Sequence, residues 1–89
     1  MAEKNGKLKR HNGAAIRAFR VKDGKKPGQF ASECLISYST LDNIENERKE
    51  ASVEVLYRIA GVLNVPVEAI VRDPATLVAG VTREPEAVA

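Results

Sequence analysis

The chain has 89 residues, a net charge of +2 and a single cysteine. This length is typical of one domain, and one cysteine excludes an intrachain disulfide. No apolar run approaches the roughly 18 residues that a membrane span needs, and the polar start of the chain lacks the apolar stretch of a signal peptide. We therefore expect a cytoplasmic protein with one compact domain.

Positive charge is concentrated at the start of the chain. Residues 1–28 carry nine basic and two acidic groups, residues 29–71 carry three and seven, and residues 72–89 carry two and three. This asymmetry indicates a polyanionic partner, although a solvated tail and an exposed helix face give the same pattern. Charge alone does not choose between these interpretations.

The first third of the chain predicts a basic arm followed by two helices. Residues 1–12 are polar and show no periodicity, which is typical of a flexible arm. A helix is expected from Gly13, capped by Asn12 and ended by Gly24. A second helix is predicted over residues 27–34, because proline is favoured at the first helical position.

Two further helices are predicted after a short turn. Ser37 is a favourable N-cap for a third helix over Tyr38–Glu45, and Ser52 is one for a fourth helix. The fourth helix ends near Asn64 and has a clear apolar stripe that consists of Val53, Leu56, Ile59, Ala60 and Leu63.

The last part of the chain predicts a short fifth helix and a tail. Pro66 favours the start of this helix, and Pro74 ends the regular part, because proline disfavours helix at the residue before it. Residues 74–89 predict a mobile tail, a candidate dimerisation element. The compact domain is therefore predicted at residues 13–73, as an all-α fold without strands.

Two short helices joined by a three-residue turn form a helix-turn-helix unit, predicted here at residues 27–45. Its helices cross steeply, so a small residue must lie where their backbones approach, and Ala31 has that position. Apolar side chains must face the core from both helices, as Phe30, Cys34, Ile36, Leu41 and Ile44 do. The outward side of the second helix carries polar side chains that can hydrogen-bond: Tyr38, Ser39, Thr40, Asp42 and Asn43.

The chain resembles the phage repressor family that includes Cro and the lambdoid repressors, also called Xre-type regulators. The matching motifs are FA at 30–31, IS at 36–37, STL at 39–41, NIEN at 43–46 and SVEVLYRIAGVLNVPVEAIV at 52–71. The resemblance covers roughly residues 14–71 and needs no gap. It implies a compact five-helix, lambda-repressor-like domain whose third helix enters the DNA major groove. Dimers of such proteins read two half-sites about 34 Å apart.

The resemblance also implies three groups of DNA contacts. Bases or the flanking backbone would be contacted by Tyr38, Ser39, Thr40 and Asn43, with Asn43 able to pair bidentately with adenine. Phosphates would be contacted by Lys25, Lys26, the backbone N–H groups of Gly28 and Gln29, Arg48 and Lys49. The arm residues that would reach along the duplex are Lys7, Lys9 and Arg10. Arg20 and Glu45 occupy positions that form a buried ion pair in several relatives, and we expect the same structural pair here.

These implications favour a sequence-specific transcriptional regulator at the nucleoid, a repressor or Cro-like switch of a phage or mobile element. The alternative is an antitoxin or a protein-interaction adaptor on the same fold. The acidic residues at 42–50 and the tail suggest this alternative. A homodimer is expected on family grounds. Its contacts would come from the fifth helix and the tail, through Val67, Ile70, Val71 and Leu77.

Four features depart from the family pattern. Leu35 replaces the usual glycine of the turn, and a left-handed conformation costs a non-glycine residue about 1 kcal/mol or more. Pro27 replaces a glutamine that contacts phosphate. Glu47 replaces a common glycine, so Asn46 is expected to take the special backbone angle. Four carboxylates are expected close to the DNA face, where they would repel phosphate: Asp42, Glu45, Glu47 and Glu50.

Nothing in the sequence predicts an enzyme, a cofactor or a metal site. His11 is a lone histidine in the arm without a second ligand. Glu33, Asp42 and Glu45 lack a nucleophile with an oriented base. Cys34 is most simply a small core residue, with a reactive thiol as the alternative.

Overall fold

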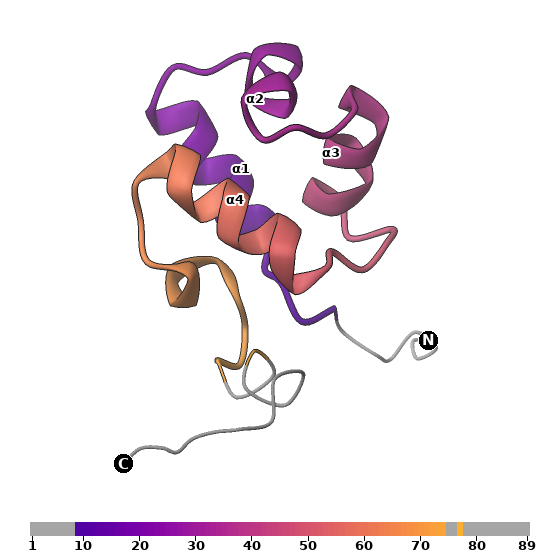
Figure 1. Cartoon of the computed structure of the whole chain (residues 1–89), viewed down its shortest axis with the longest axis vertical. Helices are drawn as coiled ribbons and strands as arrows, with labels where there is room; N and C mark the ends of the chain where they lie inside the picture. The colour runs from indigo at the N-terminus through magenta and orange to yellow at the C-terminus, as the bar shows by residue number, and fades with distance from the viewer. Residues whose placement is uncertain (1–8, 75–76, 78–89) are drawn as a thin grey trace.

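The computed structural model describes residues 9–74 and residue 77 (Figure 1). Its elements in chain order are α1 (Gly13–Lys22), α2 (Pro27–Glu33), α3 (Tyr38–Glu45), α4 (Val53–Leu63) and the 3-10 turn η1 (Val67–Ile70). Over these residues the fold is all-α, without a strand, and a single isolated β-bridge joins His11 to Val71. The α4 helix crosses in front of α1 in Figure 1, while α2 and α3 lie next to each other at the top and right of the view.

The helix starts follow the local capping signals. The side chain of Asn12 accepts a hydrogen bond from the Ala15 N–H (3.1 Å), and Ser37 Oγ accepts one from the Thr40 N–H (3.0 Å). Ser52 Oγ does the same for the Val55 N–H (3.2 Å). Each oxygen satisfies an N–H that has no partner within the helix. All three predicted caps are therefore confirmed.

The prediction of a fifth α-helix is wrong, because residues 67–70 form only a 3-10 turn. Pro66 is extended (φ −64°, ψ 146°) and lies outside the turn as its N-cap. The Ile70 carbonyl oxygen accepts a hydrogen bond from the Asn12 N–H (2.8 Å), and Val71 is extended where it pairs with His11. Pairing with a distant segment thus replaces the hydrogen bonds that a longer helix would make.

The same pairing draws part of the expected arm into the fold. His11 is completely buried, and its Nε2 lies 2.8 Å from the Ile44 carbonyl oxygen. The Arg72 N–H donates to the Arg10 carbonyl oxygen (2.8 Å) on the other side of the bridge. The prediction of a flexible arm over residues 1–12 is therefore wrong for residues 10–12. Lys7 and the tail beyond Pro74, except Leu77, lie outside the described residues.

The core lies between α1, α4 and the helix-turn-helix pair. Its largest fully buried apolar side chains are Phe30, Ile16, Leu41, Leu56, Ile59 and Ile70. Cys34 is buried among them, and burial raises the pKa of its thiol to about 11, as expected for a core residue. The side chains expected at a dimer interface are 7% exposed or less and belong to the core of the monomer: Val67, Ile70, Val71 and Leu77.

Two connections adopt left-handed backbone at residues other than glycine. Leu35 in the α2–α3 turn has φ +63°, so the turn keeps the conformation that glycine usually provides. After α3, Glu47 has φ +57°, whereas Asn46 has φ −94°. The expectation that Asn46 takes the special angle is therefore wrong. Glu47 is held there by its carboxylate, which accepts the Gly13 N–H (2.7 Å) and pairs with Arg72 (2.9 Å).

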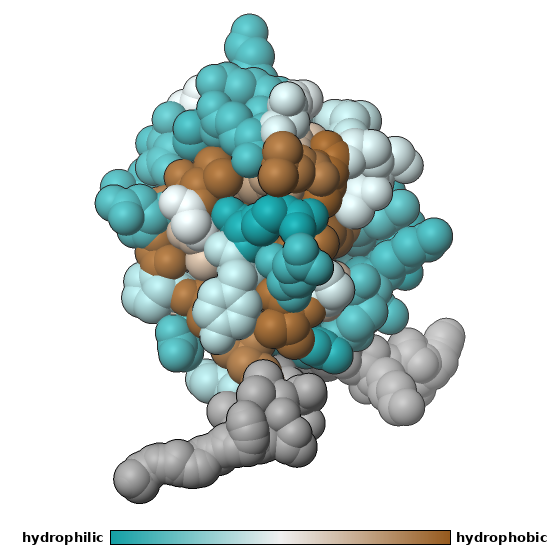
Figure 2. All heavy atoms as spheres, in the orientation of Figure 1, coloured by the Kyte–Doolittle hydropathy of each residue, from teal (hydrophilic) through white to brown (hydrophobic). Residues whose placement is uncertain are grey.

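The surface carries few large apolar side chains. Those exposed in the described part of the chain are Val21, Leu35, Tyr38 and Tyr57. On the face drawn in Figure 2, which α4 crosses, brown apolar residues lie among teal hydrophilic ones. No helix within the described residues is both long and apolar enough to span a membrane.

Candidate nucleic-acid interface

The α2–α3 unit has the packing predicted for it. Phe30 and Ala31 of α2, with Cys34 after it, are buried against Leu41 and Ile44 of α3. Ile36 in the turn is partly buried against the same core, and its N–H donates to the Ala31 carbonyl oxygen (3.0 Å). The unit therefore presents α3 on a rigid support.

The opposite side of α3 is polar. Because successive residues of a helix are 100° apart, burial of Leu41 and Ile44 turns positions 39, 42, 43 and 46 outward. We call Ser39, Asp42, Asn43 and Asn46 the outer stripe. Of these residues, Ser39 and Asn43 are predicted base readers, whereas Asn46 is not among the DNA contacts predicted from the sequence. The i, i+3, i+4, i+7 spacing from Ser39 is the signal that could have found it.

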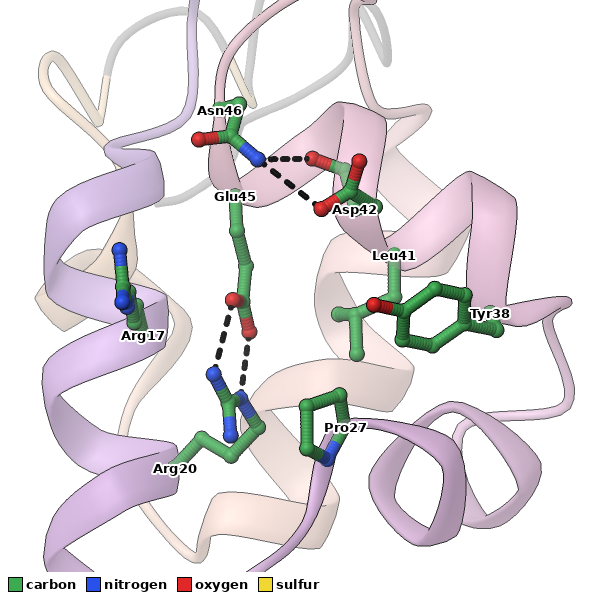
Figure 3. A pocket seen from close by; sticks show the side chains of 8 residues that line it. All are labelled: Arg17, Arg20, Pro27, Tyr38, Leu41, Asp42, Glu45 and Asn46. Carbon is green, nitrogen blue, oxygen red and sulfur yellow. Dashed lines mark hydrogen bonds and ion pairs between the residues drawn. The ribbon is translucent and has the colours of Figure 1, made fainter.

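The other two predicted base readers lie on the flanks of this stripe. Tyr38 is 58% exposed and lines a hollow of about 180 Å³ between α1, the start of α2 and α3 (Figure 3). Thr40 is exposed at the start of α3, where its Oγ1 accepts a hydrogen bond from Ser37 Oγ (2.9 Å). Both side chains belong to the first turn of α3 and flank the stripe, Tyr38 on the side of the hollow.

The predicted ion pair between Arg20 and Glu45 is present at the floor of the same hollow (Figure 3). Arg20 donates from Nε (2.7 Å) and Nη2 (3.1 Å) to the two carboxylate oxygens, and from Nη1 to the Lys25 carbonyl oxygen (3.0 Å). Both side chains are 9% exposed. The hydrogen bond to Glu45 raises the pKa of Arg20 above its ordinary value. The pair fixes α3 against α1.

Some predicted phosphate ligands form contacts within the protein, and others are exposed without an ion pair to a described residue. Lys25 is half-buried and pairs with Glu33 (2.9 Å), and this hydrogen bond lowers the pKa of Glu33. Lys26, Gly28 and Gln29 are exposed at the start of α2, and Lys49 is exposed after α3. Of these lysines, Lys26 and Lys49 form no ion pair with a described residue.

Arg17 is a further cation, and it is not among the phosphate ligands predicted from the sequence. It lies on α1, lines the hollow across from Tyr38, and forms no ion pair with any described residue (Figure 3). It precedes Arg20 by three residues, which places both on one face of α1. That spacing was the available signal.

Arg48 does not extend away from α3 as a phosphate ligand would. Its Nε donates to Asn43 Oδ1 (3.0 Å), and its Nη2 pairs with the Asp42 carboxylate. Asn46 Nδ2 donates to the same carboxylate (3.1 Å). The predicted adenine reader Asn43 therefore already uses its carbonyl oxygen within the protein.

The expected repulsion from carboxylates near α3 is largely neutralised. Glu45 pairs with Arg20, Asp42 with Arg48, Glu47 with Arg72 and Glu50 with Arg10. The last pair also removes Arg10 from the predicted arm contacts, while the Lys9 carbonyl accepts a hydrogen bond from Arg72 (3.3 Å). In the described part of the chain, no three His, Cys, Asp or Glu side chains gather as metal ligands would.

Burial and hydrogen bonding oppose each other at Glu47 and Glu50. Burial raises the pKa of Glu47, but hydrogen bonds from Arg72 and the Gly13 N–H outweigh it and lower the pKa overall. Burial likewise raises the pKa of Glu50, and hydrogen bonds from the backbone and side chain of Arg10 reverse the effect. Both carboxylates are therefore stabilised in their charged form and hold the start of the chain against the loop after α3.

Known proteins share this architecture. The helix-turn-helix family model matches residues 16–70. The clp gene regulator ClgR from Corynebacterium glutamicum is 32% identical, over 78% of this chain and 69% of that chain, with a TM-score of 0.61. The restriction-modification controller protein C.AhdI from Aeromonas hydrophila is 18% identical, over 64% of this chain and 83% of that chain, with a TM-score of 0.62, which is a likeness of fold.

SinR from Bacillus subtilis, the master regulator for biofilm formation, is also similar. In its crystal structure in complex with DNA it is 26% identical, over 63% of this chain and 90% of that chain, with a TM-score of 0.60. A second structure is a complex of SinR with the SinI protein. It is also 26% identical, over 63% of this chain and 55% of that chain, and its TM-score is 0.61. Among curated proteins, none matches the sequence of this chain.

Proposed function

The chain belongs to the helix-turn-helix family, and from this premise we propose that it is a DNA-binding transcriptional regulator that inserts α3 into the major groove. The observation that carries the proposal is the outer stripe of α3, whose polar side chains face away from a well-packed core. The major groove admits one α-helix and displays hydrogen-bonding groups of each base pair. The similarity to SinR, whose crystal structure is a complex with DNA, supports DNA as the ligand.

The surroundings of α3 fit the phosphates on either side of a groove. Lys26 at the start of α2 and Lys49 after α3 are exposed cations without an ion pair among the described residues, and Arg17 adds a third beside the hollow. Cations at such positions set the register of a protein on the duplex, while the helix between them reads the bases. We propose these three residues as the principal phosphate ligands, with Gly28 and Gln29 contributing from the first turn of α2.

We also propose that the protein binds DNA as a homodimer that reads two half-sites about 34 Å apart. The exposed apolar residues Tyr57 and Val21 are candidates for the contact, since the core residues once expected there are buried. The antitoxin or adaptor alternative finds support in the complex of SinR with SinI. In this chain, however, the carboxylates that motivated it are paired internally, so DNA binding is favoured.

Selection from a library of random DNA duplexes tests the proposal without knowledge of the operator. The purified protein should enrich a two-fold symmetric sequence, and fluorescence anisotropy should then give tighter binding to this duplex than to a scrambled one. Ser39→Glu, which places a carboxylate against the bases, should weaken binding at least tenfold. Ala69→Glu adds the same charge at an exposed position of η1, outside α2 and α3, and should have little effect.

Two outcomes would contradict the proposal. One is the absence of any enriched sequence. The other is equal weakening by Ser39→Glu and Ala69→Glu, which would show that α3 is not the reading element.

A further inference from the structure

We propose that Arg48 reads a base, and that Asp42 and Asn43 are positioning residues that hold its guanidinium group over the outer stripe. This inference rests on the proposed function and changes the role of Arg48 from phosphate ligand to specificity determinant. It also changes the role of Asn43, which the resemblance assigned to adenine.

Arg48 is tied to α3 by its backbone and by its side chain. Its N–H donates to the Asn43 carbonyl oxygen (2.8 Å), which fixes the loop against the end of the helix. Its Nε then donates to Asn43 Oδ1 (3.0 Å), and its Nη2 pairs with the Asp42 carboxylate. Asn46 Nδ2 holds that carboxylate from the other side (3.1 Å). The guanidinium group is therefore placed on the stripe that would face the bases.

The occupied edge of the guanidinium group leaves a second edge for DNA. A guanidinium group has five N–H donors in one plane. The bonds to Asn43 and Asp42 use Nε and one Nη2 hydrogen, on the same edge. The edge formed by Nη1 and the other Nη2 hydrogen contacts no hydrogen-bond acceptor among the described residues, and the Arg48 side chain is 56% exposed. Such an edge matches the O6 and N7 acceptors of guanine, the commonest specific contact of arginine.

The pairing of Arg48 with Asp42 also reduces the electrostatic repulsion between this carboxylate and DNA. An unpaired carboxylate on the outer stripe would repel the phosphates, whereas the Asp42–Arg48 pair has no net charge. A side chain that is ordered before binding loses less conformational entropy when the complex forms. The pair thus orients one specific donor edge and adds little non-specific attraction.

The arrangement predicts guanine opposite Arg48. Asn43 Oδ1 already accepts a hydrogen bond, so a bidentate contact with adenine would compete with Arg48 for that oxygen. Asn43 Nδ2 remains a donor and fits a neighbouring acceptor.

The test compares Arg48→Ala with Lys49→Ala on duplexes derived from the selected sequence. Each base pair of a half-site is changed in turn, and binding is measured by anisotropy at several salt concentrations. Arg48→Ala should abolish the preference for one G·C pair, which in the wild type should be about tenfold or more. Lys49→Ala, the matched control, should weaken binding to all duplexes alike and reduce the salt slope by about 1.

Two further variants separate positioning from contact. Arg48→Lys should not restore the preference, because an ammonium group lacks the bidentate fork. Asp42→Asn removes the charge that orients the guanidinium group, so it should reduce the preference for the same G·C pair while total affinity rises or stays constant. If Asp42 acted only in folding, Asp42→Asn would reduce thermal stability and leave the preference for the G·C pair unchanged.

The failure of this inference can be told from failure of the proposed function. If the wild type enriches a sequence but Arg48→Ala weakens binding to all duplexes equally and lowers the salt slope, Arg48 is a phosphate ligand and the inference is overturned. An unchanged preference in Asp42→Asn overturns the positioning role. If the wild type enriches no sequence, the proposed function itself fails and this inference fails with it.

Discussion

Gly13 is the point at which the start of α1 comes closest to the end of α3. A Cβ atom at this position would lie 2.3 Å from the Glu45 carbonyl oxygen and 2.7 Å from that of Ile44. Both are backbone atoms, which cannot rotate away as a side chain does. The N–H of the same residue binds Glu47 (2.7 Å), so the position is constrained from two directions.

We predict that Gly13→Ala lowers the free energy of unfolding by about 3 kcal/mol, the upper part of the range for overpacking. Gly61→Ala is the matched control, because Gly61 lies within α4 and a Cβ there meets nothing within 4 Å. It should raise the free energy of unfolding by about 0.5–1 kcal/mol through helix propensity. Urea unfolding of the two variants measures both effects. Similar values for both would show that the close approach is not present in solution.

Leu35 stores backbone strain in the turn between α2 and α3. It has φ +63°, and its side chain is 76% exposed, so little burial is lost when the side chain is removed. We predict that Leu35→Gly raises the free energy of unfolding by up to about 1 kcal/mol, partly offset by the greater entropy of the unfolded chain. Ser32→Gly, in the helical backbone of α2, should instead lower it by about 0.5 kcal/mol. A loss of stability in Leu35→Gly would contradict the strain.

At the scale of elements, the helices could be predicted because their capping signals are local. The fifth element could not, because its conformation depends on pairing with a distant segment. Caps at Asn12, Ser37 and Ser52 act within four residues of their partners, so they could be recognised directly. The conversion of the fifth helix into η1 depends on hydrogen bonds to residues more than 50 positions away. No periodicity within 66–71 contains that information.

The same distinction holds for the candidate interface. Periodicity identified the outward face of α3, since it follows from which residues are buried. The position of Arg48 depends on how the loop after α3 returns along the helix, and that depends on Glu47 accepting left-handed backbone. The sequence predicts this angle at Asn46, and the phosphate contact expected of Arg48 comes from the family resemblance alone, which contains no information about this loop.

The Arg20–Glu45 pair joins α1 to α3 and gives a prediction at this scale. Glu45→Ala should lower the free energy of unfolding by about 3 kcal/mol, because it leaves a nearly buried guanidinium group without its counter-charge. The double variant Arg20→Met/Glu45→Leu should recover much of this loss, since the uncompensated charge is gone. Glu54→Ala, in the exposed pair with Arg58, is the control and should cost much less. Equal losses for Glu45→Ala and Glu54→Ala would contradict a structural role of the buried pair.

At the scale of the whole molecule, two carboxylates join the first and last described segments, residues 10–13 and 70–72, to the loop after α3. Residues 10–12 pair with residues 70–72, and the loop after α3 holds both segments. Glu47 binds Gly13 and Arg72, while Glu50 binds the backbone and side chain of Arg10. Segments from the start, middle and end of the described chain therefore meet at two charged groups, and their charge controls whether the closure is stable.

This closure predicts a loss of stability in acid. The pKa values of Glu47 and Glu50 are lowered in the folded state from their ordinary value of 4.5. The stabilisation they provide is therefore complete above pH 4.5 and is lost as the pH falls through the lower folded-state values. The free energy of unfolding, measured with urea at a series of pH values, should be clearly larger at pH 6 than at pH 3.

The variant Glu47→Gln isolates the contribution of one carboxylate. Glutamine keeps the shape and one acceptor oxygen but carries no charge at any pH. The variant should be less stable than the wild type at pH 6, and the two stability curves should converge as the pH falls through the lowered pKa of Glu47, where this carboxylate is protonated in the wild type. Glu68→Gln, at an exposed position of η1 without an ion pair among the described residues, should leave the curve unchanged. Parallel curves for Glu47→Gln and the wild type would mean that the charge of Glu47 does not hold Gly13 and Arg72 together.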